Sequence, residues 1–139
     1  MPAKKQTEEQ KILAMKPEHY MNTQQQAFFR QRLEQEKQAL LLHIAELKQG
    51  LQGGDNHGDE ADKALREEEL RLLFRQIDRE SRLLPKIDAA LTRLRNGEYG
   101  YCLESGDPIG LPRLLLRPTA ELSIDAKAAQ EIRELGYRK

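Results

Sequence analysis

The stretch Gly100-Tyr-Cys-Leu-Glu-Ser-Gly-Asp-Pro-Ile-Gly110, with Arg117-Pro-Thr-Ala-Glu-Leu-Ser-Ile-Asp-Ala-Lys127 after it, has the pattern of a zinc-ribbon module without its metal ligands. The four positions at zinc-finger spacing are Cys102, Ser105, Ser123 and Ala126. Four cysteines there would close a tetrahedral zinc site. The chain has only one cysteine, serine hydroxyls stay neutral near pH 7, and alanine offers no ligand. We therefore predict a ribbon-like globular end that binds no zinc.

The composition favours exposed helices over a large core. Of the 139 residues, 33% are charged and 38% hydrophobic, and 23 basic side chains balance 23 acidic ones. A neutral chain is a poor candidate for direct DNA binding, which phosphate neutralisation drives. No stretch approaches the roughly 20 apolar residues of a membrane span, and the polar N-terminus is no signal peptide. One cysteine excludes an internal disulfide, so we expect a soluble cytoplasmic protein.

Upstream of the ribbon, two long segments repeat apolar residues at helical spacing, the pattern of a coiled-coil seam. Asn22 or Thr23 can cap the first helix, with Gln25 or Gln26 three residues on as a capping-box partner, and the helix is predicted to reach Gln52. The first seam comprises Phe29, Leu33, Leu40, Ile44, Leu47 and Leu51, and the second comprises Leu70, Leu73, Ile77, Leu84, Ile87, Leu91 and Leu94.

The turn between the seams decides how the helices pair. Gly53-Gly54-Asp55-Asn56-His57-Gly58 ends the first helix, and the second is predicted to run from near Asp59 to about Arg95. Because neither apolar stripe can stay in water, the helices must fold back as an antiparallel hairpin. Pro85 interrupts the second helix, so we expect a kink or short break around Ser81–Pro85.

The predicted fold class is mainly α. It consists of a long antiparallel coiled-coil hairpin, a small zinc-ribbon-like globular end without metal, and a C-terminal helix. That last helix is predicted to be capped by Ser123 and to run to about Leu135, with Gly136 after its end, following a turn-rich segment with short strands. The predicted divisions are a loose N-terminal arm at 1–22 with a short helix near Lys11–Lys16, a coiled coil at 23–97 with its tip at 53–64, and the globular end at 98–139.

These motifs resemble the DksA/TraR family of bacterial transcription regulators. The ribbon part of the match is Gly100–Cys102, Pro108–Arg113, Arg117–Ala120 and Leu122–Lys127. In the hairpin, Asp59-Glu-Ala-Asp-Lys-Ala64 fits the family's tip signature. The resemblance covers roughly residues 18–135. This sequence departs from the family's pattern in two respects: three of the four zinc-binding cysteines are missing, and Pro85 lies in the second helix.

The resemblance implies a regulator, not an enzyme, that binds RNA polymerase as a monomer without contacting DNA. Its coiled coil would enter the secondary channel, through which nucleoside triphosphates reach the active centre. There it would alter open-complex stability at sensitive promoters together with the alarmone ppGpp.

The resemblance also implies site residues. Asp59, Asp62 and Ala64 would act at the tip, although the two aspartates could instead complement the helix dipole at a helix start. Leu83, Lys86, Arg117 and Lys127 would form the ppGpp and polymerase interface, with Ile124 and Glu131 in rim docking. Cys102 is read as a small residue left from a lost zinc site, with a redox sensor as the alternative.

Three other functions stay open from the residues alone. One is a structural or adaptor coiled coil with no polymerase role. Another is a hydrolase or nuclease built on Asp55, His57, Asp59 and Asp62, although these lack a nucleophile–base arrangement. The third is a cleavage-type factor that positions Mg²⁺ at the tip.

Overall fold

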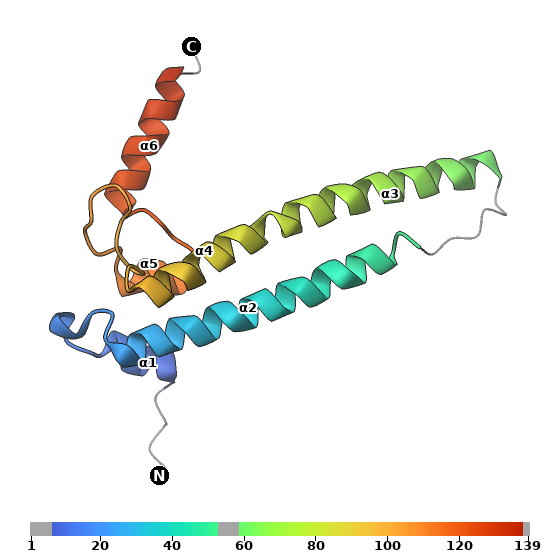
Figure 1. Ribbon diagram of the computed structural model, residues 1–139. Coiled ribbons are helices and arrows are strands. Elements are labelled where there is room, and N and C mark those ends of the chain that lie inside the picture. Colours follow the sequence, from blue (N-terminus) through green and yellow to red (C-terminus); the bar gives the residue numbers. More distant parts are fainter. Residues whose placement is uncertain (1–6, 53–58, 138–139) are drawn as a thin grey trace, which may run out of the picture. The chain divides into compact units, whose positions relative to one another are not determined.

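The computed structural model describes residues 7–52 and 59–137, and it is mainly helical (Figure 1). The chain divides into two compact units. Glu34–Asp88 form the hairpin unit, and the described residues up to Leu33 and from Ala89 onward form the globular unit. None of the helices in these described ranges is long and apolar enough to cross a membrane.

The hairpin unit pairs two helices in opposite directions, as the seams predicted (Figure 1). Helix α2 comprises Thr23–Gln49, α3 comprises Glu60–Ser81 and α4 comprises Leu83–Asn96. Near one end, the Arg66 guanidinium donates to the Gly50 carbonyl at 3.0 Å. Near the other, Lys37 Nζ lies 2.7 Å from the Asp88 carboxylate. These contacts join early residues of one arm of the hairpin to late residues of the other, so the pair is antiparallel.

The predicted seam forms the interface of the hairpin. Ile44 and Ile87 are buried, and the other seam positions of this unit are half-buried. Apolar residues off the seam are exposed, among them Leu65 and Phe74 at 64% and 59%. Two helices alone share a single contact line, so most seam side chains keep part of their surface in water.

The predicted break near Pro85 is confirmed. Helix α3 ends at Ser81, Arg82 forms a turn, and α4 begins at Leu83. Pro85 is thus the third residue of α4. In the first turn of a helix the backbone N–H has no intrahelical acceptor, so a proline there removes no hydrogen bond.

Within residues 7–22 the structure has two short helical elements where the sequence suggested a loose arm. Helix α1 is Glu8–Leu13, earlier than the predicted Lys11–Lys16, and Pro17–His19 form a 3₁₀ turn, η1. The Tyr20 hydroxyl then donates to the Gly100 carbonyl at 2.5 Å and accepts from the Gly110 N–H at 3.0 Å. These long-range bonds attach the segment before α2 to the ribbon.

The ribbon contains a helix that the sequence did not predict, α5 at Leu111–Leu116, and ends in α6 at Ile124–Tyr137. Within the described residues, the predicted short strands reduce to one isolated bridge between Tyr101 and Pro108. Helix α6 also continues through Gly136, where we expected it to have ended. A single glycine in a last turn costs only about 1 kcal/mol, which the helix tolerates.

The core of the globular unit joins α2, α4, the ribbon and α5. Its fully buried side chains include Phe29, Leu33 and Leu114, and the Phe29 and Tyr99 rings lie 5.5 Å apart between centroids. Ile124 and Ile132 of α6 lie outside this core, because their side chains are 66% and 70% exposed. Helix α6 therefore adds little to the apolar core.

Candidate functional site

The tip motif begins α3. Asp59 is the N-cap residue, and its Oδ1 accepts the Asp62 backbone N–H at 2.9 Å. Glu60 and Asp62 lie in the first turn, and Asp59, Asp62 and Ala64 are all exposed. Asp59 therefore has a structural task, because its oxygen satisfies one of the free N–H groups of the helix start. The neighbouring predicted tip residues 53–58, with Asp55 and His57, lie outside the described residues.

Charge is segregated along α3 and the start of α4. The first part, residues 59–69, has acidic Asp59, Glu60, Asp62, Glu67, Glu68 and Glu69 against basic Lys63 and Arg66. The next part has a basic stripe, which we define as Arg71, Arg75, Arg79, Arg82 and Lys86, all exposed.

The basic stripe repeats at intervals of three or four residues, so its members share one face of the helical arm. Exposed ion pairs join Arg71 to Glu68 at 2.7 Å and Arg82 to Asp78 at 3.0 Å. Such pairs are weak and readily exchanged for a partner's carboxylates. Of these five residues, only Lys86 was predicted from the sequence to be a site residue, although the regular spacing of the arginines is visible there.

The predicted effector residues are divided between the units. Leu83 and Lys86 are exposed at the start of α4 in the hairpin unit. In the globular unit, Arg117 is exposed directly after α5, and the half-buried Lys127 donates to Gln130 within α6 at 3.1 Å.

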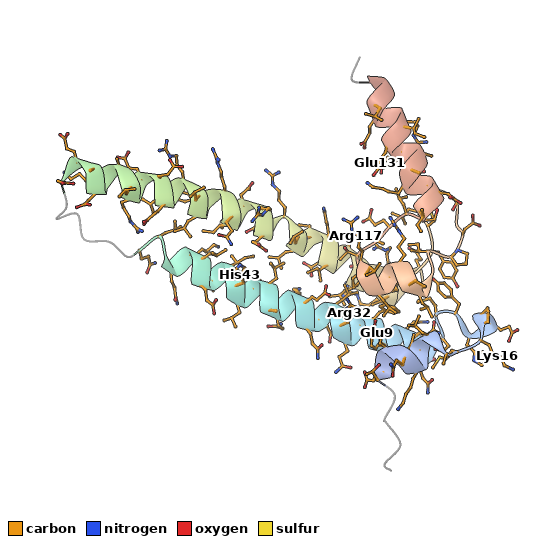
Figure 2. All side chains as sticks on the ribbon, turned by 180° about the vertical axis from the view of Figure 1, so that it is seen from behind. Glu9, Lys16, Arg32, His43, Arg117 and Glu131 are labelled. Atoms are coloured by element: carbon orange, nitrogen blue, oxygen red, sulfur yellow. The ribbon has the colours of Figure 1, made fainter. Side chains whose placement is uncertain are left out.

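Two contacts order the surroundings of Arg117 and α6. Arg113 Nε donates to the Leu122 carbonyl at 2.9 Å and so links α5 to the segment before α6. The Ala120 N–H donates to the Arg117 carbonyl at 2.9 Å and closes the turn after α5. Figure 2 shows Arg117 near α5 and Glu131 on α6. The predicted rim residues Ile124 and Glu131 are both exposed on that helix.

Three of the four zinc-finger positions meet in the ribbon. Cys102 is buried, and the pKa of its thiol is lowered to about 6. The main cause is a hydrogen bond from the Ser105 hydroxyl. Burial raises this pKa, and hydrogen bonds from the backbone N–H groups of Ser123, Ser105 and Glu104 lower it further. The fourth position, Ala126, donates its N–H to the Ser123 hydroxyl at 3.2 Å, which caps α6 as predicted.

This donor set does not fit a zinc ion. Its members are one thiol, two serine hydroxyls that already make hydrogen bonds, and a methyl group. Structural zinc requires four cysteine or histidine ligands. Across residues 7–52 and 59–137, no group of three His, Cys, Asp or Glu side chains is placed to hold a metal.

Polar contacts link the ribbon segments that a metal would otherwise tie together. The Leu103 N–H donates to the Glu121 carbonyl at 2.9 Å, and the Glu121 side chain lies 3.3 Å from Arg93 on α4. Arg93 is only 9% exposed, so this pair is shielded from water on one side. The buried Tyr99 hydroxyl donates to the Pro118 carbonyl at 2.7 Å. None of these contacts was foreseen from the sequence.

Two protein families match consecutive parts of the chain. Residues 25–94 match the DnaK suppressor protein DksA N-terminal domain, and residues 97–131 match the prokaryotic dksA/traR C4-type zinc finger.

The chain belongs to the DksA family.

Relatives named RNA polymerase-binding transcription factor DksA support this assignment over most of their length. The one from Caulobacter vibrioides is 43% identical over 122 residues, covering 87% of this chain and 86% of the relative. The one from Escherichia coli is 41% identical over 118 residues, covering 84% and 78%. The family resemblance inferred from the motifs is therefore confirmed.

Solved DksA structures support the fold. Transcription factor DksA2 from Pseudomonas aeruginosa superposes with a TM-score of 0.80 at 47% identity, covering 92% of this chain and 98% of that one. The RNA polymerase binding protein and transcriptional regulator Dks from Chlamydia trachomatis, at 23% identity and a TM-score of 0.51, covers 83% of this chain and shares the fold. The predicted fold class is confirmed.

Proposed function

We propose that this DksA-family chain is a transcription regulator that binds RNA polymerase through its secondary channel, without contacting DNA. There it alters open-complex stability at sensitive promoters together with ppGpp, and it does so without a structural zinc. The observation that carries the proposal is an antiparallel hairpin with exposed carboxylates at the start of α3, in a chain 41–43% identical to polymerase-binding DksA proteins.

In this proposal residues 23–97 are the inserted arm, and 98–139 stay at the channel rim with Ile124 and Glu131. The separation of acidic and basic residues along α3 supports this orientation, in which the tip of the hairpin enters the channel first. Carboxylates at the tip would act near the catalytic centre, while the four arginines of the basic stripe would face an acidic surface of the polymerase. The chain would work as a cytoplasmic monomer and carry out no catalysis of its own.

Binding and transcription measurements test the function. The labelled chain should bind core RNA polymerase saturably, and the affinity should fall as salt rises because the basic stripe contributes charge pairs. In transcription from a ribosomal RNA promoter, the chain should inhibit alone and inhibit more with ppGpp. An adaptor coiled coil would not bind the polymerase, and a cleavage-type factor would shorten transcripts in backtracked complexes.

The ppGpp interface gives a separate prediction. Replacing Lys86, Arg117 or Lys127 with alanine should reduce the additional effect of ppGpp more than the effect of the protein alone. The reason is that each of these cations is proposed to bond a phosphate group of ppGpp, and charge-assisted hydrogen bonds to phosphate are strong. The measurement is promoter inhibition across a ppGpp titration. Equal loss of both effects would place the residue in docking or folding instead.

Metal independence gives another prediction. A structural zinc site supplies an apparent folding free energy of about 10–16 kcal/mol, roughly the whole stability of a small domain. This chain should keep its thermal midpoint and its promoter inhibition in a strong chelator, and elemental analysis should find no stoichiometric zinc. Cys102→Ser should stay functional, because a hydroxyl can occupy the same hydrogen-bonded position. One tightly held zinc per chain, or unfolding on chelation, would contradict the prediction.

A further inference from the structure

A groove of about 360 Å³ lies between α1 and the first turns of α2, on the globular unit. Its apolar lining includes Ile12, Phe28 and Met15, and the charged side chains of Glu8 and Lys11 stand beside them. Ile12 is buried, whereas Met15 remains partly open to solvent. Met15 therefore lines a groove that opens to solvent.

Two side-chain amides converge on that thioether. The Nδ2 of Asn22 and the Nε2 of Gln25 each lie 3.5 Å from the Met15 sulfur. The orientation of both amides is set by their oxygens. Asn22 Oδ1 accepts the Gln25 backbone N–H at 2.9 Å, and Gln25 Oε1 accepts the Met21 backbone N–H at 2.7 Å. Only an amide oxygen can accept these bonds, so the NH₂ groups must face the sulfur.

Sulfur is a poor partner for these donors. Gln25 is only 1% exposed, so its NH₂ group is shielded from bulk water and has a weak acceptor in the thioether. A buried amide N–H without a strong acceptor costs free energy. An oxygen on the Met15 sulfur would supply that acceptor.

We propose that Met15 is a site of reversible oxidation by hydrogen peroxide, and that the Asn22 and Gln25 amides hold the sulfoxide oxygen. A sulfur lone pair attacks one peroxide oxygen, an S–O bond forms and the O–O bond breaks. The other oxygen leaves as hydroxide and takes the proton from the oxygen now bound to sulfur, which gives the sulfoxide and water. Sulfur is oxidised by two electrons and the peroxide is reduced.

The outcome differs from ordinary methionine oxidation. A sulfoxide in an apolar core disrupts packing because it is polar. At Met15 the polar oxygen meets two donors that are already in place, so oxidation strengthens the contact between α1 and the start of α2. The other methionine of this region, Met21, is 7% exposed, and its side chain packs so closely on Gly100 that a Cβ there would lie 2.9 Å from its Cγ.

The test is limited peroxide treatment of the full chain, followed by peptide mass spectrometry and thermal unfolding. Met15 should form sulfoxide about tenfold faster than Met21, in keeping with their accessibility. The thermal midpoint of the Met15-oxidised chain should be higher than that of the untreated chain. Met15→Leu, treated in parallel, should show no such effect and corrects for oxidation elsewhere.

A matched variant isolates the amide donors. Asn22→Ser keeps an oxygen that can cap α2 but removes one NH₂ group. Oxidation of Met15 should lower the thermal midpoint in this variant relative to its own untreated form. Similar rates at Met15 and Met21 would overturn the proposal, and so would a fall in the midpoint of the otherwise unaltered chain once Met15 is oxidised.

Discussion

The double variant Asp59→Asn, Asp62→Asn is expected to lose inhibition of a sensitive promoter while it folds normally and binds RNA polymerase with nearly unchanged affinity. The asparagine that replaces Asp59 can still cap α3, because its amide oxygen can accept the same backbone N–H that Asp59 accepts at 2.9 Å. The change therefore removes two negative charges and little else. Inhibition in transcription, polymerase binding and the thermal midpoint should be measured on the same preparation.

Glu60→Gln is the matched control for the tip. Glu60 lies in the same first turn and is also exposed, but it is outside the proposed functional pair. This variant should keep most of the inhibition. Full inhibition by the double variant would show that Asp59 and Asp62 only cap α3 and complement its dipole.

The second large effect is a loss of folding stability, and it is expected when Phe29 is replaced. Its side chain is fully buried, and its ring lies 5.5 Å from Tyr99 of the ribbon and 5.2 Å from Phe28. Phe29→Ala should lower the free energy of unfolding by about 3–5 kcal/mol, through lost burial and the cavity left behind. Chemical denaturation measures this directly.

Phe74→Ala provides the comparison within the same chain. Phe74 is 59% exposed on α3. Its truncation should therefore change the free energy of unfolding by only about 0.5 kcal/mol. Equal losses at Phe29 and Phe74 would contradict the view that stability without metal comes from the core around α2 and the ribbon.

Features that depend on neighbouring residues could be predicted from the sequence. Asn22 and Ser123 each accept the backbone N–H three residues ahead, so the type and spacing of residues were enough to find these caps. Asp59 caps α3 in the same way, whereas the sequence placed it only near the helix start. Helical periodicity identified the hairpin in the same way, and the tolerance of proline in a first turn explains the break before Pro85. The candidate tip residues were found from a local motif, and their function stays a prediction.

The sequence by itself determined the two hairpin helices and the C-terminal helix, the caps at Asn22 and Ser123, and the lack of zinc ligands, because each depends on residue types a few positions apart. Only the tertiary structure decided which distant segments meet. Tyr20 bonds Gly100 across 80 positions and Arg93 pairs with Glu121 across 28, and neither partner is marked by a local pattern. The exposure of Ile124 was decided in the same way, since an apolar helix face is buried only where another segment covers it.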